Sequence, residues 1–272
     1  MPLLEYHQSH INYEFRDHPK GNHGTLVLLH GFLEDSRMWK ELTPNLEHIG
    51  SILMIDLPGH GKTPSFGYVH TMDFMAGCVR AVLDHLDVTK CVLLGHSMGG
   101  YAALAFTHLY PNYLTGLGLF FSTPEADSPE RVEMRFRAAE LVKKNKSAFI
   151  RAAIPQLFDL DTRNSYKDEI SSQIQESLTL ETQGILASLM GMRSRPDRTS
   201  VLYDPPSQLV PSRIAVFAGE KDTVIPFQGV QGWWNAESVG FRYLSDHGHM
   251  GHISDSKRCG MAIAEWWQTL LP

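Results

Sequence analysis

Strand-like and helix-like patterns alternate along most of this 272-residue chain, and this alternation restricts its fold more than any other feature. A half-buried strand pattern occupies residues 11–16. Near-continuous apolar runs, typical of strands covered on both faces, occupy residues 25–30, 51–57, 91–95, 114–122 and 213–219, and residues 241–245 form a further strand pattern. Apolar residues at helical spacing fill the intervals at 71–86, 98–110, 227–234 and towards 270. The alternation predicts an α/β fold, with a mostly parallel central sheet and helices on both faces.

A helical interruption divides this pattern. Residues 124–210 lack strand patterns, and one apolar stripe at helical spacing there consists of Val132, Phe136, Ala139 and Val142. We therefore predict a core built from residues 1–123 and 211–272, with residues 124–210 inserted as a helical cap. Such an insertion is expected to cover the carboxyl ends of the strands, where α/β proteins bind their ligands.

The composition excludes several classes of protein. Hydrophobic residues make up 43% of the chain and charged residues 20%, which provides enough apolar surface for a core and excludes intrinsic disorder. The net charge is −6 and no long basic run is present, so we expect no nucleic-acid partner. No apolar segment reaches the roughly 18 residues of a membrane helix, and the N-terminus shows no signal peptide. With three scattered cysteines, we expect a reduced, cytoplasmic protein without membrane contacts.

The strongest local motif is Gly95-His96-Ser97-Met98-Gly99, which lies directly between a predicted strand and a predicted helix. So tight a turn strains the serine backbone and leaves no room for large side chains two positions before and after it. It projects the hydroxyl at a helix N-terminus, where partial positive charge favours a developing anion. The alternative is a glycine-rich turn with an incidental serine, and the strand–turn–helix context favours a nucleophile.

A serine nucleophile needs a general base and an acid that orients the base. Three candidate bases lie just beyond the last predicted strand: His247, His249 and His252. Asp222 follows the apolar run at 213–219 and is the candidate acid. The chain order Ser97, Asp222, His249 is nucleophile, acid, base, as expected for α/β-hydrolases.

Four blocks together resemble the α/β-hydrolase superfamily. They are His30-Gly31-Phe32 after a predicted strand, the segment Asp56-Leu57-Pro58-Gly59-His60-Gly61-Lys62-Thr63, the Ser97 turn, and the turns with Asp222 and His249. The resemblance implies the α/β-hydrolase fold with an inserted helical cap. A serine in the nucleophile turn argues against the haloalkane dehalogenases and epoxide hydrolases of this superfamily, in which that position is a carboxylate.

The resemblance implies roles for five residues. Ser97 is the expected nucleophile, Asp222 the acid, and His249 the base, because it stands in a Gly-His step after the last strand. The backbone N–H groups of Phe32 and Met98 are expected to form the oxyanion hole. No cofactor is expected.

Alternatives at the site stay open. His252 is the main alternative base, and Glu125 or Asp127 could replace Asp222 as the acid. The three neighbouring histidines also suggest a metal site, but no cysteine or carboxylate set stands at ligand spacing, so we expect no metal. Ser254 is the predicted N-cap of the last helix.

The sequence predicts a carboxylesterase-like serine hydrolase that cleaves a small to medium ester, lactone or thioester through an acyl-enzyme on Ser97. The expected partner is a small-molecule ester, and the protein is expected to be a monomer or a homodimer. Six apolar residues of the insertion predict an apolar pocket lining: Met134, Phe136, Phe149, Leu157, Phe158 and Met190.

Two other functions remain. The first is a carbon–carbon lyase similar to the menaquinone-pathway synthase that eliminates pyruvate. It would need cationic cap residues to bind carboxylates, and Arg131, Arg135 or Arg151 could serve. The second is a non-catalytic ligand-binding protein on the same fold, which an intact triad disfavours because a receptor does not need one.

Overall fold

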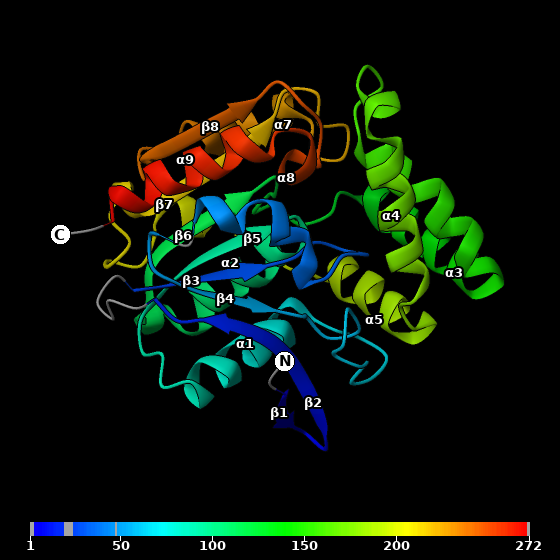
Figure 1. The fold of residues 1–272 in the computed structure, drawn as a ribbon, viewed down its shortest axis with the longest axis horizontal. Coiled ribbons are helices and arrows are strands. Elements are labelled where there is room, and N and C mark those ends of the chain that lie inside the picture. The colour runs from blue at the N-terminus through cyan, green and yellow to red at the C-terminus, as the bar shows by residue number, and fades with distance from the viewer. Residues whose placement is uncertain (1–2, 19–23, 47, 271–272) are drawn as a thin grey trace.

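The computed structural model describes residues 3–18, 24–46 and 48–270. In these ranges one eight-stranded sheet runs through the molecule in the order β1-β2-β4-β3-β5-β6-β7-β8 (Figure 1). Its strands are β1 Leu3–Tyr6, β2 Ser9–Arg16, β3 Thr25–Leu29, β4 Ser51–Ile55, β5 Cys91–His96, β6 Leu114–Phe120, β7 Ile214–Gly219 and β8 Phe241–Ser245. The pairs from β4 through β8 are parallel, and β1 and β2 join antiparallel at one edge. The alternating pattern therefore predicts the sheet correctly.

The residues of each central strand alternate between two hydrophobic clusters. In β3, Val27 and Leu29 belong to the cluster that includes α1 (Met72–His85) and α2 (Met98–Leu109). Leu26 and Leu28 belong to the cluster on the other face, with α9 (Ser256–Gln268). Because helices cover both faces, successive apolar positions are buried, and the strands appear in the sequence as continuous apolar runs.

The segment between β6 and β7 forms four helices, which we call the cap helices: α3 Pro129–Ala153, α4 Lys167–Leu178, α5 Thr182–Arg193 and the short α6 Ser200–Tyr203. Figure 1 shows α3, α4 and α5 grouped at one end of the sheet. α3 bends at Asn145, whose side chain accepts a hydrogen bond from the Ala148 N–H and so caps the second half of the helix. Among the helices of the described ranges, none is both long and apolar enough to cross a bilayer.

The predicted bounds of the strands and helices lie within two residues of the observed ones, with two departures. β1 is absent from the prediction, since its turn at His7 and Gln8 (φ 46° and 64°) lacks the Asn-Gly type of signal that usually marks a hairpin. The prediction of Ser254 as an N-cap is wrong. The chain bends at Asp255, so Ser254 ends α8 (Gly251–Ser254) and Asp255 occupies the N-cap position of α9.

Candidate active site

Ser97 lies in the turn between β5 and α2. Its backbone is left-handed, with φ 47° and ψ −112°, and its side chain makes no capping hydrogen bond to α2. A Cβ atom at Gly95 would overlap the Gly99 carbonyl oxygen, and one at Gly99 would overlap the Leu29 carbonyl oxygen. The two glycines therefore allow α2 to start directly against the strands, which leaves the Ser97 hydroxyl at the N-terminus of a helix.

His249 and Asp222 form a buried pair in the turns after β8 and β7. His249 Nδ1 lies 2.7 Å from Asp222 Oδ2, and Asp222 Oδ1 accepts hydrogen bonds of 2.8 Å from the N–H groups of Val224 and Ile225. Because Nδ1 donates to the carboxylate, Nε2 is the basic nitrogen of neutral His249. Ser97 and His249 line one cavity. Within the described ranges no hydrogen bond joins the Ser97 hydroxyl to His249, and such contacts often tighten only when substrate binds.

The other candidate bases and acids bind elsewhere. His252 Nε2 lies 3.3 Å from Glu34 Oε1. His247 Nδ1 lies 3.9 Å from Oδ2 of Asp159, in the segment between β6 and β7. Asp127 pairs with arginines of the cap segment, and Glu125 is exposed. The structure thus brings Asp222 and His249 together with Ser97. The three histidines of the metal hypothesis do not converge on one point.

The loop after β3 contains the predicted oxyanion donor Phe32. Neither the Phe32 N–H nor the Met98 N–H donates a hydrogen bond within the described ranges, so both are available to a ligand oxygen. The Gly31 N–H donates to Glu34 Oε2 at 2.9 Å and fixes the start of the loop. His30, the first residue of this loop, donates a hydrogen bond of 2.8 Å from Nδ1 to the Gly31 carbonyl. Its Nε2 accepts a hydrogen bond of 2.8 Å from the Leu57 N–H, which connects the loop to the segment after β4.

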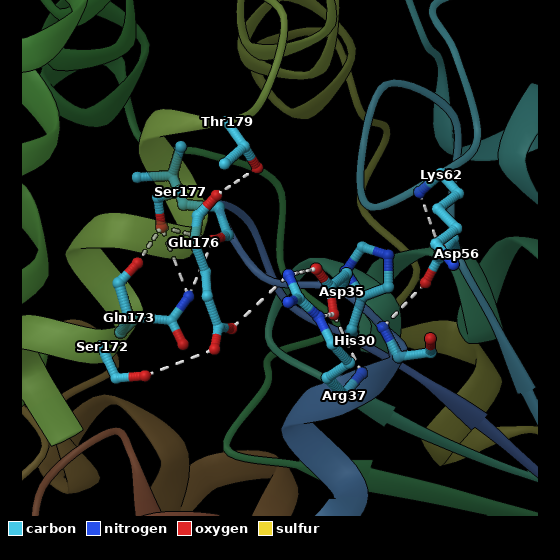
Figure 2. Close-up of polar contacts among 12 residues, drawn as sticks. His30, Asp35, Arg37, Asp56, Lys62, Ser172, Gln173, Glu176, Ser177 and Thr179 are labelled. Atoms are coloured by element: carbon cyan, nitrogen blue, oxygen red, sulfur yellow. Dashed lines mark hydrogen bonds and ion pairs between the residues drawn. The ribbon is translucent and has the colours of Figure 1, made fainter.

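Cap helix α4 holds this loop from the other side. Leu33 has a left-handed backbone (φ 65°), and its carbonyl accepts hydrogen bonds from Gln173 Nε2 at 2.9 Å and Ser177 Oγ at 2.8 Å. Figure 2 shows these α4 side chains, with the Arg37 guanidinium extending from the 3₁₀ helix Ser36–Glu41 after the loop towards Glu176, at 3.6 Å. The cap helices therefore help to fix the backbone that presents the Phe32 N–H.

A cavity of about 260 Å³ is lined by the loops after β3 and β5 and by residues of the cap helices. Its wall is mainly apolar and includes Phe32, Phe149, Leu157, Leu189, Met192 and Val224. Polar groups in the wall come from Ser97 and His249, from Glu34, His96 and Tyr101, and from two arginines of α3. The cavity therefore offers an apolar substrate pocket beside the nucleophile.

The sequence predicts six apolar cap residues in this wall. Three are there: Met134, Phe149 and Leu157. The others, Phe136, Phe158 and Met190, are not part of the wall, so that part of the prediction is wrong. Phe136 is 47% exposed, because the face of α3 that lines the cavity contains residues 131, 134, 135 and 138 rather than the apolar stripe.

A cluster of buried titratable side chains adjoins His249. Glu34 Oε2 lies 2.7 Å from His96 Nδ1, and His96 Nε2 lies 3.1 Å from the His249 backbone carbonyl. Both nitrogens of His96 therefore face acceptors, so His96 is an imidazolium paired with the Glu34 carboxylate. Burial alone would raise the pKa of Glu34, but the facing His96 and His252 outweigh it and hold that pKa well below its ordinary value. Burial opposes charge on His96 too, yet Glu34 raises its pKa.

This cluster also has a metal-like spacing, because the ligand atoms of Glu34, His96 and His252 lie within 4.8 Å of one another. The ion pair and the hydrogen bond to the His249 carbonyl account for the positions of Glu34 and His96 without an ion. The cluster is therefore interpreted as a support for the backbone at His249.

Sequence reasoning missed three side chains that support the site: Glu34, Gln173 and Ser177. Glu34 stands four residues after His30, so an acid beside the predicted oxyanion turn was a usable signal. Gln173 and Ser177 are ordinary polar residues one helical turn apart, and only their position against the Leu33 carbonyl distinguishes them.

Known proteins with similar sequences include an acetyltransferase component and a hydrolase. The dihydrolipoyllysine-residue acetyltransferase component of the acetoin cleaving system of Pseudomonas putida is 32% identical over 235 residues, which are 85% of this chain and 60% of that protein. A 2-hydroxy-6-oxononadienedioate/2-hydroxy-6-oxononatrienedioate hydrolase of Escherichia coli is 33% identical over 106 residues, which are 37% of this chain and 36% of that protein. This chain thus matches less than two thirds of the length of each of these relatives.

Solved structures match over nearly the whole chain. A thermophilic esterase from Thermogutta terrifontis, solved with malate bound, is 30% identical, with a TM-score of 0.85 over 96% of this chain and 94% of that one. An enol-lactonase from Burkholderia xenovorans LB400 shares the fold, with a TM-score of 0.88 over 98% and 100% of the two chains at 18% identity. A model of the alpha/beta hydrolase family matches residues 26–259. With this match spanning both parts of the sheet and the turns that hold Ser97, Asp222 and His249, the chain belongs to the alpha/beta hydrolase family.

Proposed function

We propose that this hydrolase cleaves a small to medium carboxylic ester, lactone or thioester through an acyl-enzyme on Ser97. The observation that carries the proposal is the 2.7 Å bond between His249 Nδ1 and Asp222, with His249 and Ser97 in the wall of one cavity. Family membership and the similar esterase from Thermogutta terrifontis support hydrolysis as the type of reaction.

In the first half of the reaction, the Ser97 oxygen attacks the carbonyl carbon and its proton moves to His249 Nε2. Asp222 keeps the imidazole in this orientation and stabilises the imidazolium. The Phe32 and Met98 N–H groups stabilise the oxyanion, and a donor of this kind is worth roughly 2.7–4 kcal/mol. The imidazolium then protonates the departing alcohol, and the acyl group remains on Ser97.

In the second half, water attacks the acyl-enzyme and gives a proton to His249 Nε2. The bond to Ser97 breaks, the serine oxygen recovers a proton from the imidazolium, and the carboxylic acid leaves. The sum is ester and water converted to acid and alcohol, with no cofactor. The cavity of about 260 Å³ suits short to medium acyl groups.

The test is hydrolysis of p-nitrophenyl esters from acetate to decanoate by the purified protein, Ser97→Ala and Ser172→Ala. Ser172 is exposed on α4 and serves as the control. We expect a chain-length optimum that disappears in Ser97→Ala and persists in Ser172→Ala. Turnover retained by Ser97→Ala, or none by the folded wild type at any chain length, would overturn the ester proposal.

The second candidate is cleavage of a carbon–carbon bond with the same residues. The observation that favours it is the presence of Arg131 and Arg135 in the cavity wall, where they could bind the carboxylates of such a substrate. One similar protein, the Escherichia coli relative, is named for hydrolysis of a dienedioate and a trienedioate. Analysis of products separates the candidates. An esterase breaks a carbon–oxygen bond and releases an alcohol, whereas a carbon–carbon hydrolase breaks a carbon–carbon bond and releases two fragments that this bond had joined.

A further inference from the structure

The cavity face of α3 contains two arginines. Arg131, Met134, Arg135 and Ala138 all line the cavity, and their spacing places them on one side of the helix. The same cavity holds Ser97. Two guanidinium groups in this mainly apolar wall need partners, because cations partly removed from water are normally paired, and the side chains of Arg131 and Arg135 are 33% and 15% exposed.

The nearby carboxylates do not balance these arginines. Glu34 also lines the cavity but is paired with His96. Asp127, whose side chain is fully buried, is shared by three guanidinium groups: Arg135 by a hydrogen-bonded ion pair, Arg195 at 2.6 Å and Arg131 at 3.9 Å. Three positive charges against one negative leave an excess of two. Burial raises the pKa of Asp197, whereas hydrogen bonds from Thr199 and Ala126 and, least of all, the charge of Arg195 lower it, so Asp197 counts as a second carboxylate near these arginines. One excess charge therefore remains on the pair that lines the cavity.

The donors of this pair are also incompletely used. Burial lowers the pKa of Arg135, and hydrogen bonds to Asp127 and Tyr101 raise it. Its Nη1 lies 3.4 Å from the Met192 sulfur, and a thioether is a weak acceptor. Arg131 donates from Nη2 to the Val224 carbonyl at 2.8 Å, and within the described ranges its Nη1 has no hydrogen-bond acceptor. Met192 and Val224 both line the cavity. The cavity therefore contains N–H donors on charged groups that an anionic oxygen would satisfy better than the protein does.

Resting on the function proposed above, we propose that Arg131 and Arg135 bind a carboxylate of the substrate, so that the enzyme prefers carboxylate-bearing esters over neutral esters of equal size. The planar guanidinium matches a carboxylate with parallel N–H groups. The apolar remainder of the wall accommodates the carbon chain between this carboxylate and the scissile carbonyl.

A purely structural role is the competing explanation, in which the arginines only join Asp127 to α3. That role predicts equal losses with neutral and charged substrates when an arginine is replaced. A carboxylate subsite predicts a loss confined to the charged substrate. The ratio of the two kcat/KM values separates the explanations.

The experiment compares mono-p-nitrophenyl adipate with two neutral esters of the same length, p-nitrophenyl hexanoate and the p-nitrophenyl ester of adipamic acid. A second arm of the experiment places the carboxylate on the alcohol part of the ester. It compares hydrolysis of butyryloxyacetate with hydrolysis of the neutral primary amide of the same ester. The proteins are the wild type, Arg131→Gln, Arg135→Gln and the control Arg137→Gln, an exposed arginine of α3 paired with Glu133.

In one of the two arms, we expect the wild type to prefer the carboxylate by at least about tenfold in kcat/KM, equivalent to about 1.4 kcal/mol. That ratio should fall towards one in Arg131→Gln and Arg135→Gln and stay unchanged in Arg137→Gln. The absence of a preference in both arms, or an unchanged ratio in both variants, overturns the subsite.

Two measurements keep this result separate from the ester proposal. Loss of hexanoate hydrolysis in Ser97→Ala tests the ester proposal without any carboxylate. Calorimetric titration with adipate tests the subsite without turnover, and we expect Arg131→Gln to bind at least about tenfold more weakly than the wild type. If Arg135→Gln does not fold, Arg131→Gln alone decides, since its side chain is one-third exposed and less embedded. Equal adipate affinity in the wild type and Arg131→Gln contradicts the proposal.

Discussion

At the scale of single residues, the Asp222 carboxylate decides which nitrogen of His249 is basic. Its Oδ2 receives the Nδ1 proton, and its Oδ1 is held by two backbone N–H groups, so the carboxylate cannot rotate away without breaking them. A neutral amide of the same shape cannot fix the tautomer in the same way, because its NH₂ group is a donor.

We therefore expect Asp222→Asn to lower kcat by about 10³- to 10⁴-fold while the protein stays folded. The measurement is steady-state hydrolysis of the best p-nitrophenyl ester, with circular dichroism as the check on folding. Asp246→Asn, at an exposed position near the same loop, should be close to wild type. Activity of Asp222→Asn within tenfold of wild type would show that this carboxylate does not orient the base.

Glu34 and His96 form an ion pair whose side chains are almost fully buried. Removing one charge leaves the other unpaired in the interior, so we expect Glu34→Gln to lower the free energy of unfolding by about 3–5 kcal/mol. Urea denaturation measures the change. The exposed pair of Glu133 and Arg137 is the control, and Glu133→Gln should change stability by less than about 1 kcal/mol. Equal effects of the two substitutions would mean that the buried pair is not charged.

The sequence predicts the residues of the site whose positions depend on local turns. Ser97 follows from a strand–turn–helix motif, and Asp222 and His249 from turns after strands. Glu34 and His96 are 62 positions apart, and no periodicity relates them. Their pairing depends on how β3 and β5 lie side by side, which only the folded sheet shows.

At the scale of elements, α4 acts on the loop that carries Phe32. Gln173 and Ser177 hold the Leu33 carbonyl and so stabilise a left-handed backbone next to the proposed oxyanion donor. If this orientation matters for catalysis, a change on α4 affects kcat although it lies outside the triad.

We expect Gln173→Leu to lower kcat roughly two- to tenfold, which corresponds to the loss of one hydrogen bond of about 0.5–1.5 kcal/mol. KM should change less, because Gln173 is not in the cavity wall. The control is Gln175→Leu, an exposed glutamine on the same helix. A rise in KM at constant kcat would instead indicate that α4 only shapes the pocket.

Elements with continuous or alternating apolar patterns were predictable, and their bounds agree closely with the structure. The cavity face of α3 was not. Its apolar stripe suggested Phe136 as a lining residue, but the helix presents Arg131 and Arg135 instead. Hydrophobic periodicity predicts which helix residues pack in the interior, but it does not identify the helix face that lines a cavity containing charged groups.

At the scale of the whole molecule, buried neutral histidines make stability depend on pH. Burial is the main cause that lowers the pKa of His60 to about 3 and that of His70 to about 4. In the unfolded chain both titrate near 6.5, so on acidification the unfolded state binds protons first. Their contribution to stability is present above about pH 6.5 and is lost as the pH falls towards these values.

We expect the free energy of unfolding to fall between pH 6.5 and 5, with each such histidine adding a slope of about 1.4 kcal/mol per pH unit. In His60→Gln, the free energy of unfolding should depend less steeply on pH than in the wild type. In His108→Gln, a substitution at an exposed position, it should depend on pH as in the wild type. Urea denaturation across this range measures both. His96, whose pKa is raised, acts in the opposite direction but is present in all three proteins. Equal slopes in His60→Gln and wild type would contradict the expectation.

The left-handed backbone of Ser97 also bears on how such a chain evolves. A non-glycine residue in a strained conformation costs about 1–3 kcal/mol, whereas glycine adopts a positive φ readily. Ser97→Gly would therefore relax the fold, and neutral drift under selection for stability alone would remove the hydroxyl. A serine at φ 47° carries that cost. We therefore expect selection at this position to act on what the hydroxyl does.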